Sequence, residues 1–203
     1  MTTATTVAVR PATTATVGLP DVLARAFQDD PVFIWWIPDA DRRRATLPAF
    51  FDLFVETFLV HDLIYVAADA TTTGTAVWGP PSNPSGIEDE DAFVAGVERS
   101  VAEIDLPRVF EIVSALADQH PTEPHYYLQW AAVRPDRQGR GIGSALLAPV
   151  LERCDREGVP AYTEATSLQN RRLYERHGFA FIGEVAAAGG PPLYRMWRLP
   201  AAG

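Results

Sequence analysis

The stretch from Tyr126 to Gly143, which reads YYLQWAAVRPDRQGRGIG, limits what this chain can fold into more than any other part of the sequence. An apolar run from Tyr126 to Val133 predicts a strand, and apolar residues at helical spacing from Ile142 to Cys154 predict a helix. Between them lie a proline turn and glycines at positions 139, 141 and 143. The pattern is that of a strand, a glycine-rich loop and a helix.

A loop of this kind is suited to bind an anion. The first turn of a helix has backbone N–H groups without intrahelical partners, and it lies at the positive end of the helix dipole. Glycines let that backbone approach a phosphate without an intervening Cβ atom, and Arg137 and Arg140 add positive charge. The residues therefore predict an anion site, suited to the pyrophosphate of a nucleotide-like cofactor.

Two other glycine-loop chemistries have to be considered. A P-loop requires a lysine after its second glycine, and this chain contains no lysine, so nucleoside triphosphate hydrolysis by that route is excluded. A dinucleotide fingerprint requires a third glycine or alanine, but counting from Gly139 or Gly141 that position falls on Ser144 or Leu146. Because Glu164 follows about 20 residues later, where such folds place a ribose-binding acid, a dinucleotide site stays open as the rival.

Two segments resemble the hallmarks of the GNAT N-acetyltransferases. Residues Val133 to Gly143 match the coenzyme A loop V-x-P-x-x-[QR]-G-x-G-x-[GA] at every position. Further along, Leu173 to Phe179 reads LYERHGF and resembles the second hallmark, L-Y-E-x-x-G-F. A lone G-x-G motif does not identify this family, but two hallmarks in the expected order do.

This resemblance implies an α/β (α+β) fold. The expected GNAT fold has a mixed, mostly antiparallel central sheet of about six or seven strands flanked by helices, with a V-shaped parallel strand pair that binds acetyl-CoA. We expect one domain over residues 1–203, with residues 1–4 disordered. Residues from about 5 to 120 would shape the acceptor side, and residues from about 125 to 199 would form the acetyl-CoA-binding core.

The pattern along the chain predicts the individual elements. Strands are expected at residues 6–10, 62–68, 73–78, 126–133, 161–164, 179–187 and 193–199. Helices are expected at residues 19–28, 42–60, 87–116 with a break near Leu106–Pro107, 142–154 and 168–177. The strands at 126–133 and 161–164 should pair in parallel, because a helix connects them.

The resemblance also implies site residues. Those expected to contact acetyl-CoA are Ala131, Ala132, Val133, Gln138, Gly139, Arg140, Gly141, Ile142, Gly143, Ser144, Asn170 and Tyr174. Tyr174 occupies the family's usual general-acid position, and Glu164 is the candidate base, acting directly or through water. The four histidines show no metal-ligand spacing, so no metal site is expected.

The segment from Asp30 to Asp39 is an aromatic run with prolines at 31 and 38, and it is predicted to be a loop. In GNAT enzymes the region between the first two helices shapes the acceptor side, so Phe33, Trp35 and Trp36 are candidates to bind the acceptor. Packing in the core is the alternative for these rings.

Composition narrows the choice of partner and compartment. The net charge of −9 and the pI near 4.9 argue against nucleic acid or an anionic membrane as partner, and favour a cationic substrate such as an amine. No signal peptide or membrane span is recognisable, so the cytoplasm is the expected compartment. The single cysteine, Cys154, is compatible with a reducing compartment.

Within the superfamily, the C-terminal half resembles the puromycin N-acetyltransferases, for instance at Gly158 to Ala161 and at Glu164. The N-terminal half matches those enzymes much less, notably at Trp35 and Trp36. The expected function is transfer of an acetyl group from acetyl-CoA to the primary amine of a small, antibiotic-like or xenobiotic molecule, by direct attack in a ternary complex. Acetylation of a protein lysine or N-terminus and a non-catalytic acyl-CoA sensor are the alternatives. The chain is expected to be a monomer or a homodimer.

Overall fold

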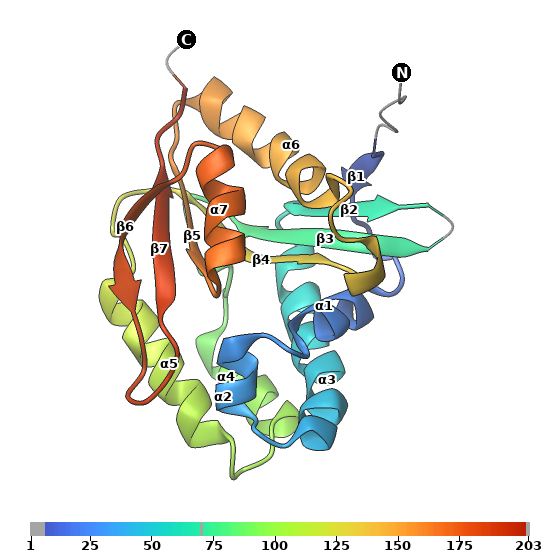
Figure 1. Ribbon diagram of the computed structural model, residues 1–203, viewed down its shortest axis with the longest axis vertical. Coiled ribbons are helices and arrows are strands. Elements are labelled where there is room, and N and C mark those ends of the chain that lie inside the picture. The colour runs from blue at the N-terminus through green and yellow to red at the C-terminus, as the bar shows by residue number, and fades with distance from the viewer. Residues whose placement is uncertain (1–6, 70, 202–203) are drawn as a thin grey trace.

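The computed structural model describes residues 7–69 and 71–201, and these form a seven-stranded sheet covered by helices (Figure 1). The strands are β1 (Val9–Pro11), β2 (Ile64–Ala68), β3 (Thr72–Gly79), β4 (Tyr126–Val133), β5 (Ala161–Ala165), β6 (Ala180–Val185) and β7 (Leu193–Arg198). The helices are α1 (Leu19–Phe27), α2 (Pro31–Trp36), α3 (Ala40–Leu59), α4 (Glu90–Ser100), α5 (Leu106–Gln119), α6 (Ile142–Glu157) and α7 (Leu168–Arg176). A 3-10 turn (Pro135–Arg137) follows β4.

The sheet divides into two parts that separate between β4 and β5. Its strand order is β1-β2-β3-β4-β5-β7-β6, and every neighbouring pair is antiparallel except β4 and β5. This parallel pair is in register only at Tyr126 with Ala161 and at Tyr127 with Tyr162. Beyond these residues the strands diverge, and β2 to β4 run in a clearly different direction from β5 to β7 (Figure 1). The GNAT fold expected from the sequence is confirmed.

Two apolar cores lie on the two faces of the sheet. One contains α1 and α3 packed on residues such as Val66 and Val77, and it includes most of the chain's phenylalanines. The other contains α6 and the ring of Tyr174 from α7 packed on residues such as Ala67 and Ala76. In β2, neighbouring residues 66 and 67 thus point to opposite cores, as the alternation of side chains in a strand requires.

The predicted loop at residues 30–39 is wrong in part, because Pro31–Trp36 is the helix α2. The side chain of Asp30 caps this helix by accepting a hydrogen bond from the Val32 N–H (2.9 Å), and Pro31 occupies the first turn. Both are favourable at a helix N-terminus. The prolines at both ends of the run obscured this short helix.

Other predicted boundaries hold with small shifts. The break in the long helical region lies at residues 101–105, and Pro107 sits in the first turn of α5, where it begins a helix rather than interrupting one. The first strand begins at Val9, and the expected disorder of residues 1–4 concerns a segment outside the described residues. Within the described part of the chain, every helix is too short or too polar to cross a membrane.

Candidate functional site

The glycine loop leads from the end of β4 into α6 and has the backbone geometry that its sequence predicts. Gly139 and Gly141 have φ angles of 74° and 78°, a backbone conformation that residues with a Cβ atom rarely adopt. A Cβ atom at either position would meet nothing within 4 Å, so glycine is required by the backbone conformation and not by crowding. Gly141 is the N-cap of α6, and the first-turn N–H groups of this helix lack intrahelical acceptors.

A cavity of about 560 Å³ lies against this loop. Eleven of the twelve residues predicted to contact the cofactor line it. They are Ala131, Ala132, Val133, Gln138, Gly139, Gly141, Ile142, Gly143, Ser144, Asn170 and Tyr174. The twelfth, Arg140, is exposed on the loop and is not part of the wall.

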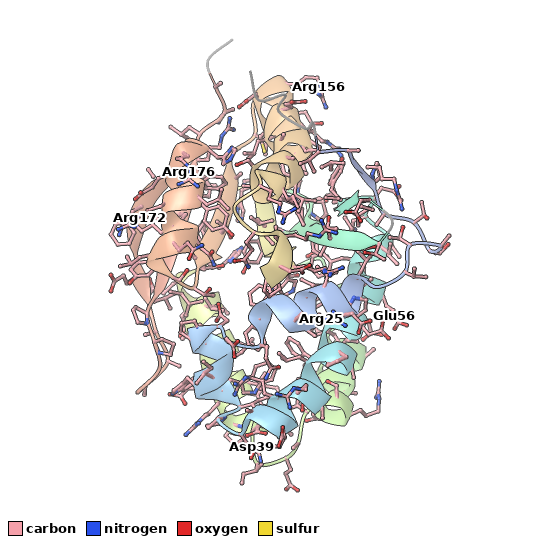
Figure 2. All side chains as sticks on the ribbon, turned by 45° about the vertical axis from the view of Figure 1, so that its right-hand side comes forward. Arg25, Asp39, Glu56, Arg156, Arg172 and Arg176 are labelled. Atoms are coloured by element: carbon pink, nitrogen blue, oxygen red, sulfur yellow. The ribbon has the colours of Figure 1, made fainter. Side chains whose placement is uncertain are left out.

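Three arginines from separate elements line this cavity: Arg25 of α1, Arg137 of the 3-10 turn and Arg176 of α7. Arg137 forms an ion pair with Asp69 (3.2 Å), whereas no ion pair of Arg25 or Arg176 is found among the described residues. Figure 2 shows Arg25 on α1 and Arg176 on α7, together with Arg172 on the same helix as Arg176. The sequence motif did not reveal Arg25 or Arg176, because neither belongs to the loop that they flank.

The strand β4 contains a bulge just before the residues that line this cavity. Its pairing with β3 joins Leu128 to Trp78 and Trp130 to Val77, which leaves Gln129 as the extra residue. Residues Ala131, Ala132 and Val133 themselves pair regularly with β3. What opens their other edge is the divergence of β4 from β5, which leaves their backbone facing the cavity.

A second, mostly apolar cavity of about 140 Å³ lies between the sheet and helices α2, α3 and α5. It shares Phe27, Ala131, Asn170 and Tyr174 with the cavity at the glycine loop, so the two meet beside the Tyr174 side chain. This meeting point, between the diverging strands β4 and β5, is where groups bound in the two cavities would come into contact.

The rings predicted to bind the acceptor divide between two faces of α2. Phe33 and Trp36 are buried and line the second cavity, as expected for residues three apart on a helix. Trp35 is not part of its wall: it packs beside Gly190, and the guanidinium of Arg108 lies over its ring. Trp35 points away from Phe33 and Trp36 because the segment is a helix and not the predicted loop.

Glu164 lies on the wall of the second cavity at the opening between β4 and β5. Its carboxylate accepts a hydrogen bond from the Tyr127 hydroxyl (2.7 Å), while its other oxygen is buried without a partner among the described residues. Burial raises the pKa of Glu164, while the hydrogen bond from Tyr127, the Tyr162 hydroxyl and the positive charge of Arg195 oppose that shift. Glu164 is therefore a buried carboxyl group and not a solvated one at the end of a strand.

Tyr174 is buried at the meeting point of the two cavities, with its ring 5.7 Å from that of Phe179. Burial raises the pKa of Tyr174 to about 12, so its hydroxyl is protonated at neutral pH. A protonated hydroxyl and a carboxyl group with a raised pKa thus line one small cavity, which is a combination suited to proton transfer in both directions.

Two hydrogen bonds that the sequence did not suggest connect the start of α2 to Asn170 of α7, which lines the cavity at the glycine loop. The Thr166 hydroxyl donates to the carboxylate of Asp30 and accepts from the Asn170 side-chain amide (3.3 Å). Asp30, Thr166 and Asn170 come from three segments that are separated by up to 140 residues. No local motif marks such a link, because it exists only once β5 and α7 lie against the start of α2.

The fold and the site together define the class of protein. A sheet that opens between one parallel pair, a glycine loop at a helix N-terminus and an adjoining cavity lined by Tyr174 and the buried Glu164 are features expected of an acyl-CoA-dependent transferase. Comparison of the sequence with known families agrees: the Acetyltransferase (GNAT) family matches residues 54–179. The chain belongs to the GNAT family of N-acetyltransferases, whose acetyl donor is acetyl-CoA.

Relatives and solved structures extend this likeness over most of the chain. A Schizosaccharomyces pombe protein, described as an uncharacterised N-acetyltransferase, is 27% identical over 172 residues, which are 78% of this chain and 68% of the relative. A Corynebacterium glutamicum structure, described as histone acetyltransferase HPA2 and related acetyltransferase, is 32% identical and covers 98% of this chain and 99% of its own, with a TM-score of 0.70. An agmatine N-acetyltransferase is 17% identical, with a TM-score of 0.62 over 96% of this chain and 100% of its own, and shows the fold alone.

Proposed function

We propose that this enzyme transfers the acetyl group of acetyl-CoA to the primary amine of a small molecule, by direct attack in a ternary complex. The observation that carries the proposal is the meeting of two cavities at Tyr174, one against the glycine loop and one enclosed by α2, α3 and α5. In this arrangement the donor and acceptor enter from different sides, and the reacting atoms meet where the acid and the base are.

The residues around the larger cavity fit acetyl-CoA. The first turn of α6 and the arginines at 25, 137 and 176 suit the phosphates, and the open edge of β4 suits the amide-bearing pantetheine arm. The positive φ angles at positions 139 and 141 favour glycine, and because glycine has no Cβ atom, the loop backbone is open to the phosphates. When bound, acetyl-CoA supplies an activated acetyl group as a thioester.

Glu164 is proposed to accept the proton that the amine loses. Its buried oxygen without a partner needs a hydrogen-bond donor, and an ammonium group supplies one. Burial raises the pKa of this carboxyl group above its usual value, which makes it a stronger base than an exposed glutamate. Tyr127 fixes the orientation of the carboxylate through its hydroxyl.

Tyr174 is proposed to donate a proton to the departing sulfur. Its hydroxyl keeps its proton at neutral pH because burial raises its pKa to about 12. Transfer then depends on proximity to sulfur that is gaining negative charge. A bound ammonium group gives one proton to Glu164 and then attacks as the neutral amine, so that the C–N bond forms and the C–S bond breaks. The second proton lost by the nitrogen replaces the one that Tyr174 gives to the sulfur, and Glu164 releases its proton to solvent.

The resemblance to puromycin N-acetyltransferases supports the roles of Tyr174 and Glu164 but not a particular acceptor. The second cavity is built from α2, α3 and α5, the half of the chain that matches those enzymes least. The comparisons give no support for puromycin or for a role in antibiotic resistance. We therefore propose a small amine without naming an antibiotic.

A protein acceptor is the second candidate, because the Corynebacterium glutamicum relative is described as a histone acetyltransferase HPA2 and related acetyltransferase. Such an acceptor needs an open groove for the peptide backbone on either side of a lysine. The cavity of about 140 Å³ is instead enclosed by three helices, which favours a small molecule.

The test is release of free thiol from acetyl-CoA against a panel of small amines and a lysine-containing peptide. We expect saturable turnover with at least one small amine, and a kcat for Tyr174→Phe lower by about 100-fold or more. The ring of the variant still packs on Phe179, so its unfolding temperature serves as the control for folding. Turnover of the peptide alone would support the protein acceptor. Tight acetyl-CoA binding without any turnover would support a sensor.

A further inference from the structure

We propose that the acceptor is a primary amine with a single positive charge on an uncharged apolar body about the size of one aromatic ring. This inference rests on the proposed function, because it assumes that the second cavity holds the acceptor. It goes beyond that function by specifying which amines fit and which are rejected.

The polar and apolar groups of this cavity lie on different sides. Polar side chains come from β4, β5 and α7, next to the meeting point with the larger cavity; they include Tyr127, Glu164, Asn170 and Tyr174. The side formed by the helices is apolar and includes Phe33, Trp36, Phe50, Phe54, Ile112 and Leu116. An acceptor that places its nitrogen beside Glu164 therefore places its body among apolar side chains.

Charge separates monoamines from diamines. Glu164 is the one charged residue among the described residues that line the cavity, and one of its oxygens lacks a partner. It can neutralise one ammonium group. A second ammonium or guanidinium group would lie against the apolar helices without a counter-ion, and an unpaired buried charge is strongly unfavourable. Diamines, agmatine and polyamines are therefore expected to be poor acceptors.

Size limits the apolar body. A cavity of about 140 Å³ is close to the roughly 150 Å³ apolar cavity known to hold one benzene molecule. Its walls are aromatic and rigidly packed: Trp36 lies 4.7 Å from Phe50 and Trp130 lies 5.2 Å from Phe54, measured between ring centroids. Edge-to-face contacts of this kind also suit an aromatic ring on the ligand. A longer acceptor would have to extend past Val113, which lines the cavity and is 54% exposed at its mouth.

The first experiment compares amines that differ in one feature. Pentylamine and 1,5-diaminopentane have the same chain length and differ by the second charge, and 2-phenylethylamine adds the ring. We expect kcat/KM for both monoamines to exceed that for the diamine by about 10-fold or more. Binding is followed separately through tryptophan fluorescence, because Trp36 and Trp130 line the cavity and report ligand entry without turnover.

The second experiment changes the charge of the cavity. Val113→Asp places a carboxylate at the mouth, where an exposed position on α5 should tolerate it. We expect the variant to shift the ratio of kcat/KM values toward 1,5-diaminopentane by about 10-fold. Ser114→Asp is the matched control, because Ser114 is the next residue of the same helix, is exposed and does not line the cavity. It should leave the ratio unchanged.

The results separate this inference from the proposed function. If no amine is acetylated but pentylamine quenches the fluorescence and the diamine does not, the cavity keeps the inferred charge preference as a binding preference only, and the proposed function fails. If the diamine or a lysine peptide is acetylated with a kcat/KM similar to that of the monoamines, the inference is overturned and the transferase function stands. If neither monoamine is acetylated or bound, the inference is overturned in any case.

Discussion

The proposed cofactor side and the proposed acceptor side of this enzyme are specified in different ways. The cofactor side depends on backbone conformation within one short stretch: positive φ at Gly139 and Gly141, followed at once by the first turn of α6. The acceptor side depends on side chains from α2, α3, α5 and β4, which meet only in the folded chain. The first leaves a motif in the sequence, and the second does not.

This difference explains what each side can tolerate. A backbone conformation that requires glycine is changed by almost any substitution, because only glycine adopts it without strain. An apolar wall can exchange one ring for another and keep its volume. Members of one family can therefore share a cofactor loop and differ in acceptor, and the predictions below test the two sides separately.

The largest expected effect is at Glu164, where the two sides meet. In Glu164→Gln the amide keeps an oxygen to accept the Tyr127 hydroxyl but can no longer accept a proton. We expect kcat/KM for the amine to fall by about 100-fold or more, with the affinity for acetyl-CoA unchanged. Wild-type activity should fall as pH drops through the raised pKa of Glu164, and the variant should lose this acidic limb. A variant with the same pH profile would remove Glu164 from the proposed role.

The same variant should be more stable than the wild type. Because the pKa of Glu164 is higher in the folded than in the unfolded chain, the folded state binds more protons, and its free energy of unfolding falls as pH rises through that interval. Glu164→Gln removes this cost at neutral pH. We expect a higher unfolding temperature at pH 7, and little difference below the pKa of an unfolded glutamate.

The cofactor side alone is tested by two alanines in one loop. Gly141→Ala forces a Cβ residue into φ of 78°, which costs about 1–2 kcal/mol, and the unfolding temperature and the affinity for acetyl-CoA should both fall. Gly143→Ala is the matched control: it lies in the first turn of α6, and its Cβ would be 3.4 Å from Leu173. Because Gly143 also lines the cofactor cavity, this control concerns stability: its unfolding temperature should stay the same or rise slightly. Equal losses in both variants would mean that crowding matters more than backbone conformation.

Much of the fold could be predicted because its elements follow from local patterns. The strand, loop and helix from Tyr126 onward, the parallel pairing of β4 with β5 and the strands β2 and β3 all match their predictions. The helix α2 was missed, since its capping by Asp30 depends on a residue that also suits a turn. The insertion of β7 between β5 and β6 was not predicted either, because strand order is set by long-range pairing.

The candidate site could be predicted only where a motif covers it. The loop residues and Tyr174 come from two hallmarks, and all but Arg140 line the expected cavity. Tyr127, which holds the Glu164 carboxylate, looks like an ordinary strand residue until β4 and β5 are placed side by side. Trp35 was grouped with its neighbours Phe33 and Trp36, although the helix turns it to another face.

The connection between the two sides is tested by Asp30. In Asp30→Ala both the cap of α2 and the hydrogen bond from Thr166 are lost. Asp39→Ala is the matched control: Asp39 caps α3 by accepting from the Arg42 N–H (2.7 Å), and it lies on the surface (Figure 2). Both variants should lower the free energy of unfolding by about 1 kcal/mol. Only Asp30→Ala should also lower kcat, because Thr166 then no longer holds Asn170 in place.

The smallest expected effect concerns the arginines that line the cofactor cavity outside the motif. Arg25→Ala and Arg176→Ala should each raise the KM for acetyl-CoA about two- to fivefold at low salt, as expected for exposed charges, and salt should remove the difference. Because the chain carries a net charge of −9, losing any arginine makes it more repulsive to an anionic cofactor. Arg172→Ala separates this general effect from a local one, since Arg172 is exposed on α7 and does not line the cavity (Figure 2). If it raises the KM as much as Arg176→Ala, the contribution of these arginines is one of net charge, and the cofactor side is specified by its loop alone.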